Sequence, residues 1–326
     1  TAVMVALSTV IYHPDPIGSL QVISRFLFLM ILLPWTLAIN FNSPKMHNLP
    51  LLILKLGTLF FSFSVIYFAL GLGREVSSLN RNFGLAEHPT DAGGFLALGS
   101  VLWFCSVARK ITIPRIFGFT LLILGLLLTG SISGLISVCV GITVSLVQFS
   151  KDSLRRKHSI LLGILILCSG LIIYSNDILN IQRRFHAATS GRYDTVTSRF
   201  QNYSESIDAI FTDLPHLLFG HGLSQSQAIL RSDIAGSFAP HNYILQMLFQ
   251  GGLLFTVLIL IYQIGSLRIS MKAKLPTKVE VISIMASQFI FALTSPVMFT
   301  RYFWLPFIIA WVIPFSSNSR ETIRKK

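Results

Sequence analysis

Long apolar runs separated by short polar segments dominate this chain. Each run reaches or approaches the roughly 17–25 residues that a helix needs to cross a bilayer. The pattern predicts about ten spans, the first of them partial. They cover about residues 1–12, 21–41, 50–71, 91–108, 114–130, 133–149, 159–175, 242–264, 279–298 and 302–316. The expected fold class is therefore all-α, a polytopic helical bundle in a membrane with one large, partly helical external loop.

The connections divide the chain into three predicted parts. Transmembrane helices occupy residues 1–175 and include a short external segment at 72–90. A large external loop follows at 176–240, and C-terminal helices with a basic tail occupy 241–326. Because an apolar run begins at Thr1 with no basic region before it, we expect no signal peptide and expect that preceding chain is missing.

Composition supports the membrane assignment. The chain is 52% hydrophobic and only 12% charged, whereas soluble domains average about 25% charged residues. The three cysteines, Cys105, Cys139 and Cys168, all lie inside apolar runs. They are expected to be small apolar core residues, and no disulfide framework or zinc site is predicted.

Basic residues gather in alternate connections. Segments 109–115, 151–157, 268–278 and 320–326 carry most of the 26 Lys and Arg residues. The positive-inside rule places these segments, and so the C-terminus, in the cytoplasm. Lys55 lies near a helix end and is expected to extend its ammonium to the interface. The net charge of +13 then reflects topology and does not indicate nucleic-acid binding.

The basic residues expected on the outside are all arginines. They are Arg74, Arg81, Arg183, Arg184, Arg192, Arg199, Arg231 and Arg301. Orientation alone does not distinguish Arg from Lys, but only the guanidinium group binds phosphate through two parallel hydrogen bonds. The pattern favours phosphate recognition by some of these arginines, with salt bridges to external acids as the alternative.

Within the large loop, residues 198–211 predict an amphipathic helix headed by Arg199, whose N-terminus is suited to bind an anion. Its predicted apolar face comprises Phe200, Tyr203, Ile207, Ile210 and Phe211. The following LLFGHGLS stretch at 217–224 predicts a turn at which the backbone closely approaches another segment.

His241 is the candidate base. Pro240 favours a helix that begins at or near His241. The helix dipole there disfavours the imidazolium form and leaves a neutral, proton-accepting ring. A capping or interfacial histidine would occupy the same position, and position alone does not separate the two roles. No metal-binding or phosphate-loop pattern occurs outside, so no metal and no cofactor are expected, and arginines would neutralise a leaving phosphate.

Three stretches, in order, resemble the O-antigen ligase and Wzy-type O-antigen and exopolysaccharide polymerase superfamily. Residues 80–94 (NRNFGLAEHPTDAGG) resemble its Arg-x-x-Gly-x-x-x-His-Pro-Asn stretch, and 128–134 (LTGSISG) resemble its Thr-x-Ser-Arg-Gly turn. Residues 198–222 and 239–243 resemble its loop pattern of an Arg, an aromatic residue, a Pro, a Gly-x-Gly turn and a His-Asn pair. The chain departs from the family at Thr90, Ile132 and Tyr203, where Asn, Arg and Trp are usual.

The resemblance implies a metal-independent, inverting glycan transfer on the outer face of the bacterial inner membrane. The implied catalytic residues are His241 as base and Arg199 and Arg81 at the pyrophosphate. The implied substrate-binding residues are Arg192 (the alternative loop arginine), Asn242, His88, Tyr203 and Arg301.

The resemblance also implies the partners. They are a polyprenyl-pyrophosphate-linked glycan donor, a glycan acceptor, the lipid bilayer, and a chain-length regulator and flippase of the same pathway. A polymerase is favoured and a ligase is the first alternative. A non-enzymatic transporter would place ionisable groups within the spans, where this chain places almost none, and a scaffold would not need the loop arginines.

Overall fold

A computed structural model of the chain describes residues 16–40, 49–72, 84–86, 88–149, 195–223, 230–232, 236–238, 240–273, 277–298 and 300–324. Every predicted span within these residues overlaps a helix, although the bounds differ, and the predicted spans 1–12 and 159–175 lie outside them. Five described helices are long and apolar enough to cross a membrane, and two further apolar helices are shorter. The all-α class is confirmed for the described residues, with one short two-stranded ribbon added.

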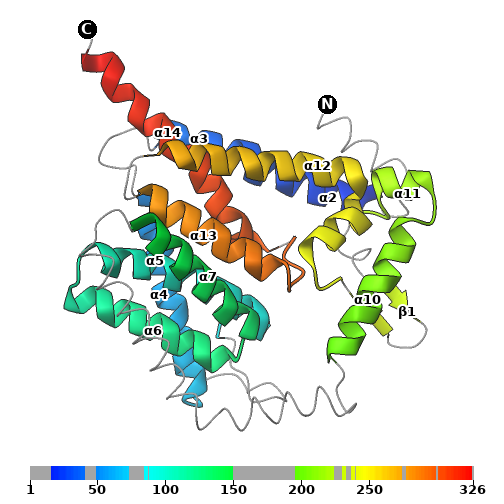
Figure 1. Cartoon of the computed structure of the whole chain (residues 1–326), viewed down its shortest axis with the longest axis horizontal. Coiled ribbons are helices and arrows are strands. Elements are labelled where there is room, and N and C mark those ends of the chain that lie inside the picture. The colour runs from blue at the N-terminus through cyan, green and yellow to red at the C-terminus, as the bar shows by residue number, and fades with distance from the viewer. Residues whose placement is uncertain are drawn as a thin grey trace. The chain divides into compact units, whose positions relative to one another are not determined.

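The helices and strands follow in chain order (Figure 1). The first three elements, α2 (Pro16–Leu27), the π-helical η1 (Phe28–Leu32) and α3 (Leu33–Asn40), follow one another without a break. The others are α4 (Leu49–Ala69), α5 (Pro89–Arg109), α6 (Ile113–Thr129), α7 (Ile132–Phe149), α10 (Thr195–Ile210), α11 (Leu214–Phe219), β1 (Leu230–Ser232), β2 (Gly236–Phe238), α12 (Tyr243–Lys272), α13 (Thr277–Ala292) and α14 (Arg301–Arg324).

Packing divides the chain into two compact units. The first comprises Thr1–Leu37, Ile181–Ser266 and Ala292–Trp304. The second comprises Ala38–Asn180, Leu267–Phe291 and Leu305–Lys326. The large loop therefore belongs to the same unit as the N-terminal part of α12.

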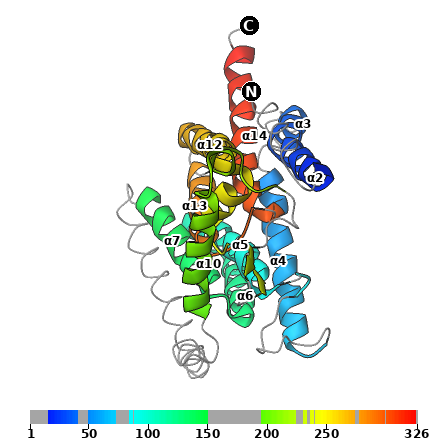
Figure 2. The same ribbon diagram turned by 90° about the vertical axis from the view of Figure 1, so that its right-hand side faces the viewer.

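Helix α5 is the centre of the second unit, where it packs against α4, α6 and α7 (Figure 2). His88 caps its N-terminus by accepting a hydrogen bond from the Thr90 amide, and Pro89 fixes its first turn. In the most apolar 18-residue stretch of α5, 78% of the residues are buried, against 28% in the corresponding stretches of α4 and α7. Helices α4 and α7 therefore keep a side that faces away from the protein, toward lipid. Small residues permit this close packing, as where Gly99 faces Thr58 of α4.

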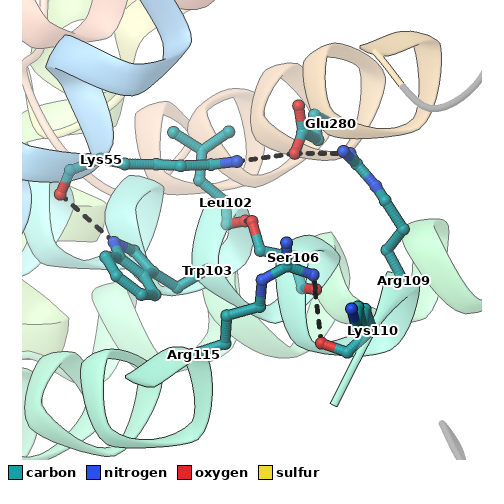
Figure 3. A network of polar contacts seen from close by, with 8 residues as sticks. All are labelled: Lys55, Leu102, Trp103, Ser106, Arg109, Lys110, Arg115 and Glu280. Atoms are coloured by element: carbon teal, nitrogen blue, oxygen red, sulfur yellow. Dashed lines mark hydrogen bonds and ion pairs between the residues drawn. The ribbon is translucent and has the colours of Figure 1, made fainter. Parts of the chain in front are cut away.

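A buried ion network joins α4, α5 and α13 (Figure 3). Glu280 of α13 is only 5% exposed, and its Oε1 accepts from Lys55 Nζ at 2.7 Å and from Arg109 Nη2 at 2.8 Å. The Trp103 indole donates to the Lys55 carbonyl at 3.2 Å. Lys55, which was expected to extend its ammonium to the interface, pairs with Glu280, because a buried carboxylate requires a paired cation.

Helix α12 is two helices joined at a sharp bend, visible at its yellow end in Figure 1. Gly252 interrupts it with φ 70° and ψ −177°. Residues 253–272 form the longer part, about 30 Å at 1.5 Å per residue, which suffices to cross a bilayer core. The predicted span 242–264 overlaps this candidate membrane helix (Tyr243–Lys272), and the structure adds the interruption at Gly252.

The predicted loop helix exists, but it buries a different face. Helix α10 covers Thr195–Ile210, and its buried side chains are Asn202, Ser206 and Ile210. Ile207 is 43% exposed, and Phe211, just beyond the helix, is 67% exposed. The predicted apolar face is therefore wrong at these two residues. It holds at Ile210, which is buried, and at Tyr203, which is half-buried. The side chain of Phe200 lies outside those that the structure describes.

Removing the Glu280 carboxylate should leave Lys55 and Arg109 without a counter-charge. We expect Glu280→Ala to lower the free energy of unfolding by about 2–3 kcal/mol, less than for a fully buried pair because both cations are partly exposed. The midpoint of thermal unfolding in detergent measures this. Asp208→Ala removes an exposed carboxylate of α10 and should change stability by under about 0.5 kcal/mol. Equal midpoints for the two variants would show that the network does not hold α13.

Candidate functional site

The start of α12 is fixed by the side chain of Asn242. Its Oδ1 accepts hydrogen bonds from the amides of Ile244 at 2.9 Å and Leu245 at 3.2 Å, which is the geometry of a helix N-cap. Its Nδ2 donates to the Leu293 carbonyl at 3.2 Å. Asn242 therefore sets where the helix begins and ties it to the segment between α13 and α14.

Tyr203 and His241, separated by 38 residues in the sequence, meet in the first unit. The Tyr203 hydroxyl donates to the His241 carbonyl at 3.1 Å. Both residues are half-buried, and Pro240 beside them is buried. The contact joins α10 to the start of α12 and links Tyr203 to the backbone of the candidate base.

The segment that follows α13 holds the first part of α12 from a second side. Gln246 Oε1 accepts from the Met298 amide at 3.3 Å, and the Met298 carbonyl accepts from the Trp304 indole at 3.0 Å. Helix α13 ends at Ala292, earlier than the predicted span 279–298, which leaves room for this connection. Arg301 begins α14 and is exposed.

Tyr243 fills the space between these elements. Its ring lies 4.7 Å from that of Phe303 and 6.1 Å from that of Trp304, and it is fully buried. Its hydroxyl accepts from Gln263 Nε2 at 2.9 Å. Offset and edge-on aromatic packing of this kind adds to the stability from burial alone. The residue after Asn242 is therefore a core anchor for the helix start.

The predicted close approach at 217–224 is confirmed, and its partner is the bend in α12. A Cβ on Gly220 would lie 2.4 Å from the Gln250 carbonyl oxygen, and one on Gly252 would lie 2.4 Å from that of Leu218. Both glycines have positive φ, +74° and +70°. Only glycine adopts this backbone and permits this approach without strain.

The turn also satisfies the carbonyls that the bend releases. The amide of His221 donates to the Phe249 carbonyl at 2.7 Å, and that of Gly222 donates to the Gln250 carbonyl at 2.9 Å. In an apolar surrounding each such group would otherwise cost several kcal/mol (roughly 2–7). The large loop and the broken helix therefore depend on each other.

A cluster that the sequence analysis did not anticipate lies beside this turn. Asp213 caps α11 by accepting from the His216 amide at 2.8 Å, and it also pairs with His216 Nδ1 at 2.7 Å. The His216 ring stacks on that of His221 with a centroid separation of 4.2 Å, and His221 stacks on Phe249 at 4.7 Å. The Asp-x-x-His spacing of a capped helix was the available signal.

The charges in this cluster are unequal. Burial lowers the pKa of His221 and so favours the neutral ring at pH 7, although the hydrogen bond that Nε2 donates to the Ala209 carbonyl at 3.0 Å opposes this. Hydrogen bonds from the amide and ring of His216 lower the pKa of Asp213, so the carboxylate is ionised there. The stack is thus built around one half-buried neutral imidazole.

The remaining predicted site residues lie in different places. Arg199 is the fifth residue of α10 and lies one turn inside the helix, because α10 begins at Thr195 rather than at 198. His88 caps α5 in the second unit. Arg81 and Arg192 lie outside the described residues. Among the residues that the structure describes, no group of three His, Cys, Asp or Glu side chains is placed to hold a metal ion.

Two of the three motif stretches contact each other in the second unit. A Cβ on Gly93 would lie 2.2 Å from that of Ser131, and one on Gly134 would lie 2.9 Å from the Gly93 carbonyl oxygen. Ser131 Oγ accepts from the Gly134 amide at 3.2 Å and so caps α7. Ile132, where the family has Arg, is 51% exposed. The turn is thus packed directly against the first turns of α5.

The five described helices that are long and apolar enough to cross a membrane indicate a multi-pass membrane protein. A family model described as O-antigen ligase matches residues 117–260. This match confirms the predicted resemblance to the O-antigen ligase and Wzy superfamily over those residues. The matched region contains the 128–134 turn, the large loop and His241, and it begins after the 80–94 stretch. The family implies a glycosyltransferase-like enzyme in general terms. Comparison with curated proteins gives no match.

The close approach at Gly252 predicts that alanine there destabilises the protein, while alanine at an uncrowded glycine does not. Gly252→Ala should lower the free energy of unfolding by at least about 2 kcal/mol, because alanine disfavours positive φ and its Cβ meets the Leu218 carbonyl. Hydrogen exchange at the amides of His221 and Gly222 should become faster. Gly57→Ala is the matched control, since nothing lies within 4 Å of a Cβ in that helix, and it should be neutral or stabilising by up to about 1 kcal/mol. Unchanged exchange in Gly252→Ala would contradict this account.

Proposed function

We propose that this chain is a membrane glycan polymerase. It transfers an oligosaccharide from undecaprenyl pyrophosphate to a growing lipid-linked polysaccharide such as an O-antigen, capsule or exopolysaccharide. The observation that carries the proposal is the placement of His241 at the start of α12, held through its carbonyl by Tyr203, within the region that matches the O-antigen ligase family.

The proposed reaction is an inverting displacement. The acceptor hydroxyl oxygen bonds to the anomeric carbon while the bond from that carbon to the pyrophosphate oxygen breaks. His241 takes the hydroxyl proton as general base. The leaving undecaprenyl pyrophosphate carries its negative charge, and Arg199 and Arg81, with Arg192 as the alternative loop arginine, stabilise it by charge-assisted hydrogen bonds.

The other residues have supporting roles in this proposal. Tyr203 and Asn242 act through the backbone, because Tyr203 binds the His241 carbonyl and Asn242 caps the helix that follows. Arg301, exposed at the start of α14, and His88, at the start of α5, are proposed to contact the substrate. Neither a metal nor a cofactor takes part.

The proposed setting is the bacterial inner membrane. About ten spans would place the C-terminus in the cytoplasm and residues 176–240 outside, between a first helical part at 1–175 and a second at 241–326. The partners would be the polyprenyl-pyrophosphate donor, a glycan acceptor, the bilayer, and a chain-length regulator and flippase of the same pathway.

The ligase remains the alternative function, because the matching family is described as O-antigen ligase. A ligase would use the same base and arginines and would differ in its acceptor, a lipid A core or another finished carrier. A transporter is the second alternative and would move the lipid-linked glycan without breaking its bond to phosphate.

Reconstitution without metal tests the reaction. Wild-type protein in liposomes with labelled undecaprenyl-pyrophosphate oligosaccharide should release undecaprenyl pyrophosphate and lengthen the glycan. His241→Ala and Arg199→Lys should each lower this rate by at least about 100-fold, through loss of the base and of bidentate phosphate binding. Arg268→Lys, an exposed arginine in the C-terminal part of α12, is the matched control and should leave the rate unchanged.

The outcomes separate the alternatives. Transfer only when a lipid A core acceptor is added indicates the ligase. Movement of an intact donor across the bilayer indicates the transporter and excludes the enzyme. Full activity of both site variants would reject the residue assignment, and loss of activity with EDTA would reject the metal-independent mechanism.

Tyr203→Phe tests the positioning role. Loss of one hydrogen bond to the His241 carbonyl should lower kcat by about tenfold, equivalent to about 1.4 kcal/mol, with little change in KM. A direct substrate contact by Tyr203 would instead raise KM. Unchanged kcat and KM would show that the contact does not position the base.

A further inference from the structure

An exposed apolar corner joins α10 to α11. We define the α10–α11 corner as Ile207, Phe211 and Leu214, which are 43%, 67% and 66% exposed. Ile207 and Phe211 are one helical turn apart, so they lie on one side of the chain as α10 ends. The opposite side of α10 is buried and partly polar, at Asn202 and Ser206. Large apolar side chains gathered on a surface mark a contact with an apolar partner.

The polar groups at this corner are satisfied from within. Thr212 Oγ1 donates to the Asp208 carbonyl at 3.1 Å, and the Phe211 amide donates to the Ile207 carbonyl at 3.1 Å. The Asp213 carboxylate pairs with the amide and ring of His216. This internal pairing suits a segment that lies at the edge of an apolar phase, where water is scarce.

The corner is tied to the membrane part of α12. The turn after α11 is bonded to Phe249 and Gln250 and lies against Gly252. Directly after Gly252, α12 exposes a run of large apolar side chains. They are Leu253 (41%), Leu254 (37%), Val257 (43%), Ile261 (60%) and Ile264 (50%). This run lies in a helix long and apolar enough to cross a membrane, so lipid is its expected surrounding.

We propose that the α10–α11 corner inserts into the boundary between lipid headgroups and acyl chains, where it continues the lipid-facing surface of α12. The occupant of this surface is the bilayer, as for amphipathic segments that lie in the membrane plane with one apolar face immersed. The proposal stands apart from the catalytic function, because it uses none of the residues placed at the reaction.

The insertion would fix the height of α10 above the bilayer. Tyr203 precedes Phe211 by about 12 Å along a helix at 1.5 Å per residue. The helix that carries the hydroxyl bound to His241 is thus anchored in lipid at its other end. The corner therefore sets how far from the acyl chains the start of α12 is held.

Site-directed spin labelling in liposomes tests the insertion. Nitroxides are attached at Phe211→Cys and Leu214→Cys in a chain with Cys105, Cys139 and Cys168 replaced. Collision with oxygen, which partitions into lipid, should exceed collision with a water-soluble nickel chelate several-fold at both positions. Val257→Cys is the lipid-facing reference, and Asp208→Cys, on the same helix as Ile207, should show the opposite preference.

Each outcome decides the proposal. Preference for nickel at Phe211→Cys and Leu214→Cys would overturn it, because the corner would then face water. Protection from both reagents would also overturn it and would indicate a protein partner or a second copy. If the chain does not fold without its cysteines, a second measurement decides the proposal. The unmodified protein is photolabelled by a lipid that carries a diazirine in its acyl chain. Labels at residues 207–214 but not at buried Asn202 and Ser206 support insertion, and their absence from 207–214 overturns it.

Discussion

The structure of the first unit depends on one constraint, that a backbone interrupted within an apolar surrounding must have its released polar groups paired. Gly252 breaks α12, and the carbonyls of Phe249 and Gln250 lose their partners in the helix. The amides of His221 and Gly222 supply replacements from the large loop. Because Gly220 and Gly252 have no side chains, the two backbones approach closely enough to bond. The loop is therefore an integral part of the broken helix and not an appendage of the bundle.

The same constraint governs charge in the second unit. Glu280 is nearly inaccessible, and a lone carboxylate there would be strongly disfavoured. Lys55 and Arg109 approach it from α4 and α5, so three helices meet at one oxygen atom. Polar amides are used likewise, as where Gln288 donates to the Gly94 carbonyl at 3.0 Å. Polar pairing fixes the register of these helices, while their apolar surfaces alone would let them slide against one another and against lipid.

The helices could be located from the sequence because length and hydropathy are local properties of an apolar run. Each of α4 to α7 lies on such a run. The apolar face predicted for α10 holds at Ile210 and Tyr203 and is wrong at Ile207 and Phe211. Ile207 and Phe211 are exposed while Asn202 and Ser206 are buried, which is the arrangement expected under the proposed insertion of this corner into lipid. The meeting of Tyr203 with His241 could not be predicted, since it depends on how two distant helices pack. The sequence does carry a signal for the bend at Gly252, namely the Gly251–Gly252 pair inside an apolar run. A hydropathy average over the whole run hides this pair.

The restraints on His241 act on its backbone. Tyr203 binds its carbonyl, Asn242 fixes the first turn after it, and Tyr243 anchors that turn in an aromatic core. Three restraints from separate elements leave the main chain of the candidate base little freedom, which is what a preorganised site needs. The turn after α11 adds a fourth restraint at the far end of the same short helix, next to the segment that we propose to lie in lipid. Under the proposed function, a base held in this way would keep a fixed height relative to the bilayer. The reacting carbon of the proposed donor, joined to a membrane-bound carrier, would also arrive at a fixed height, so the broken helix would align the two.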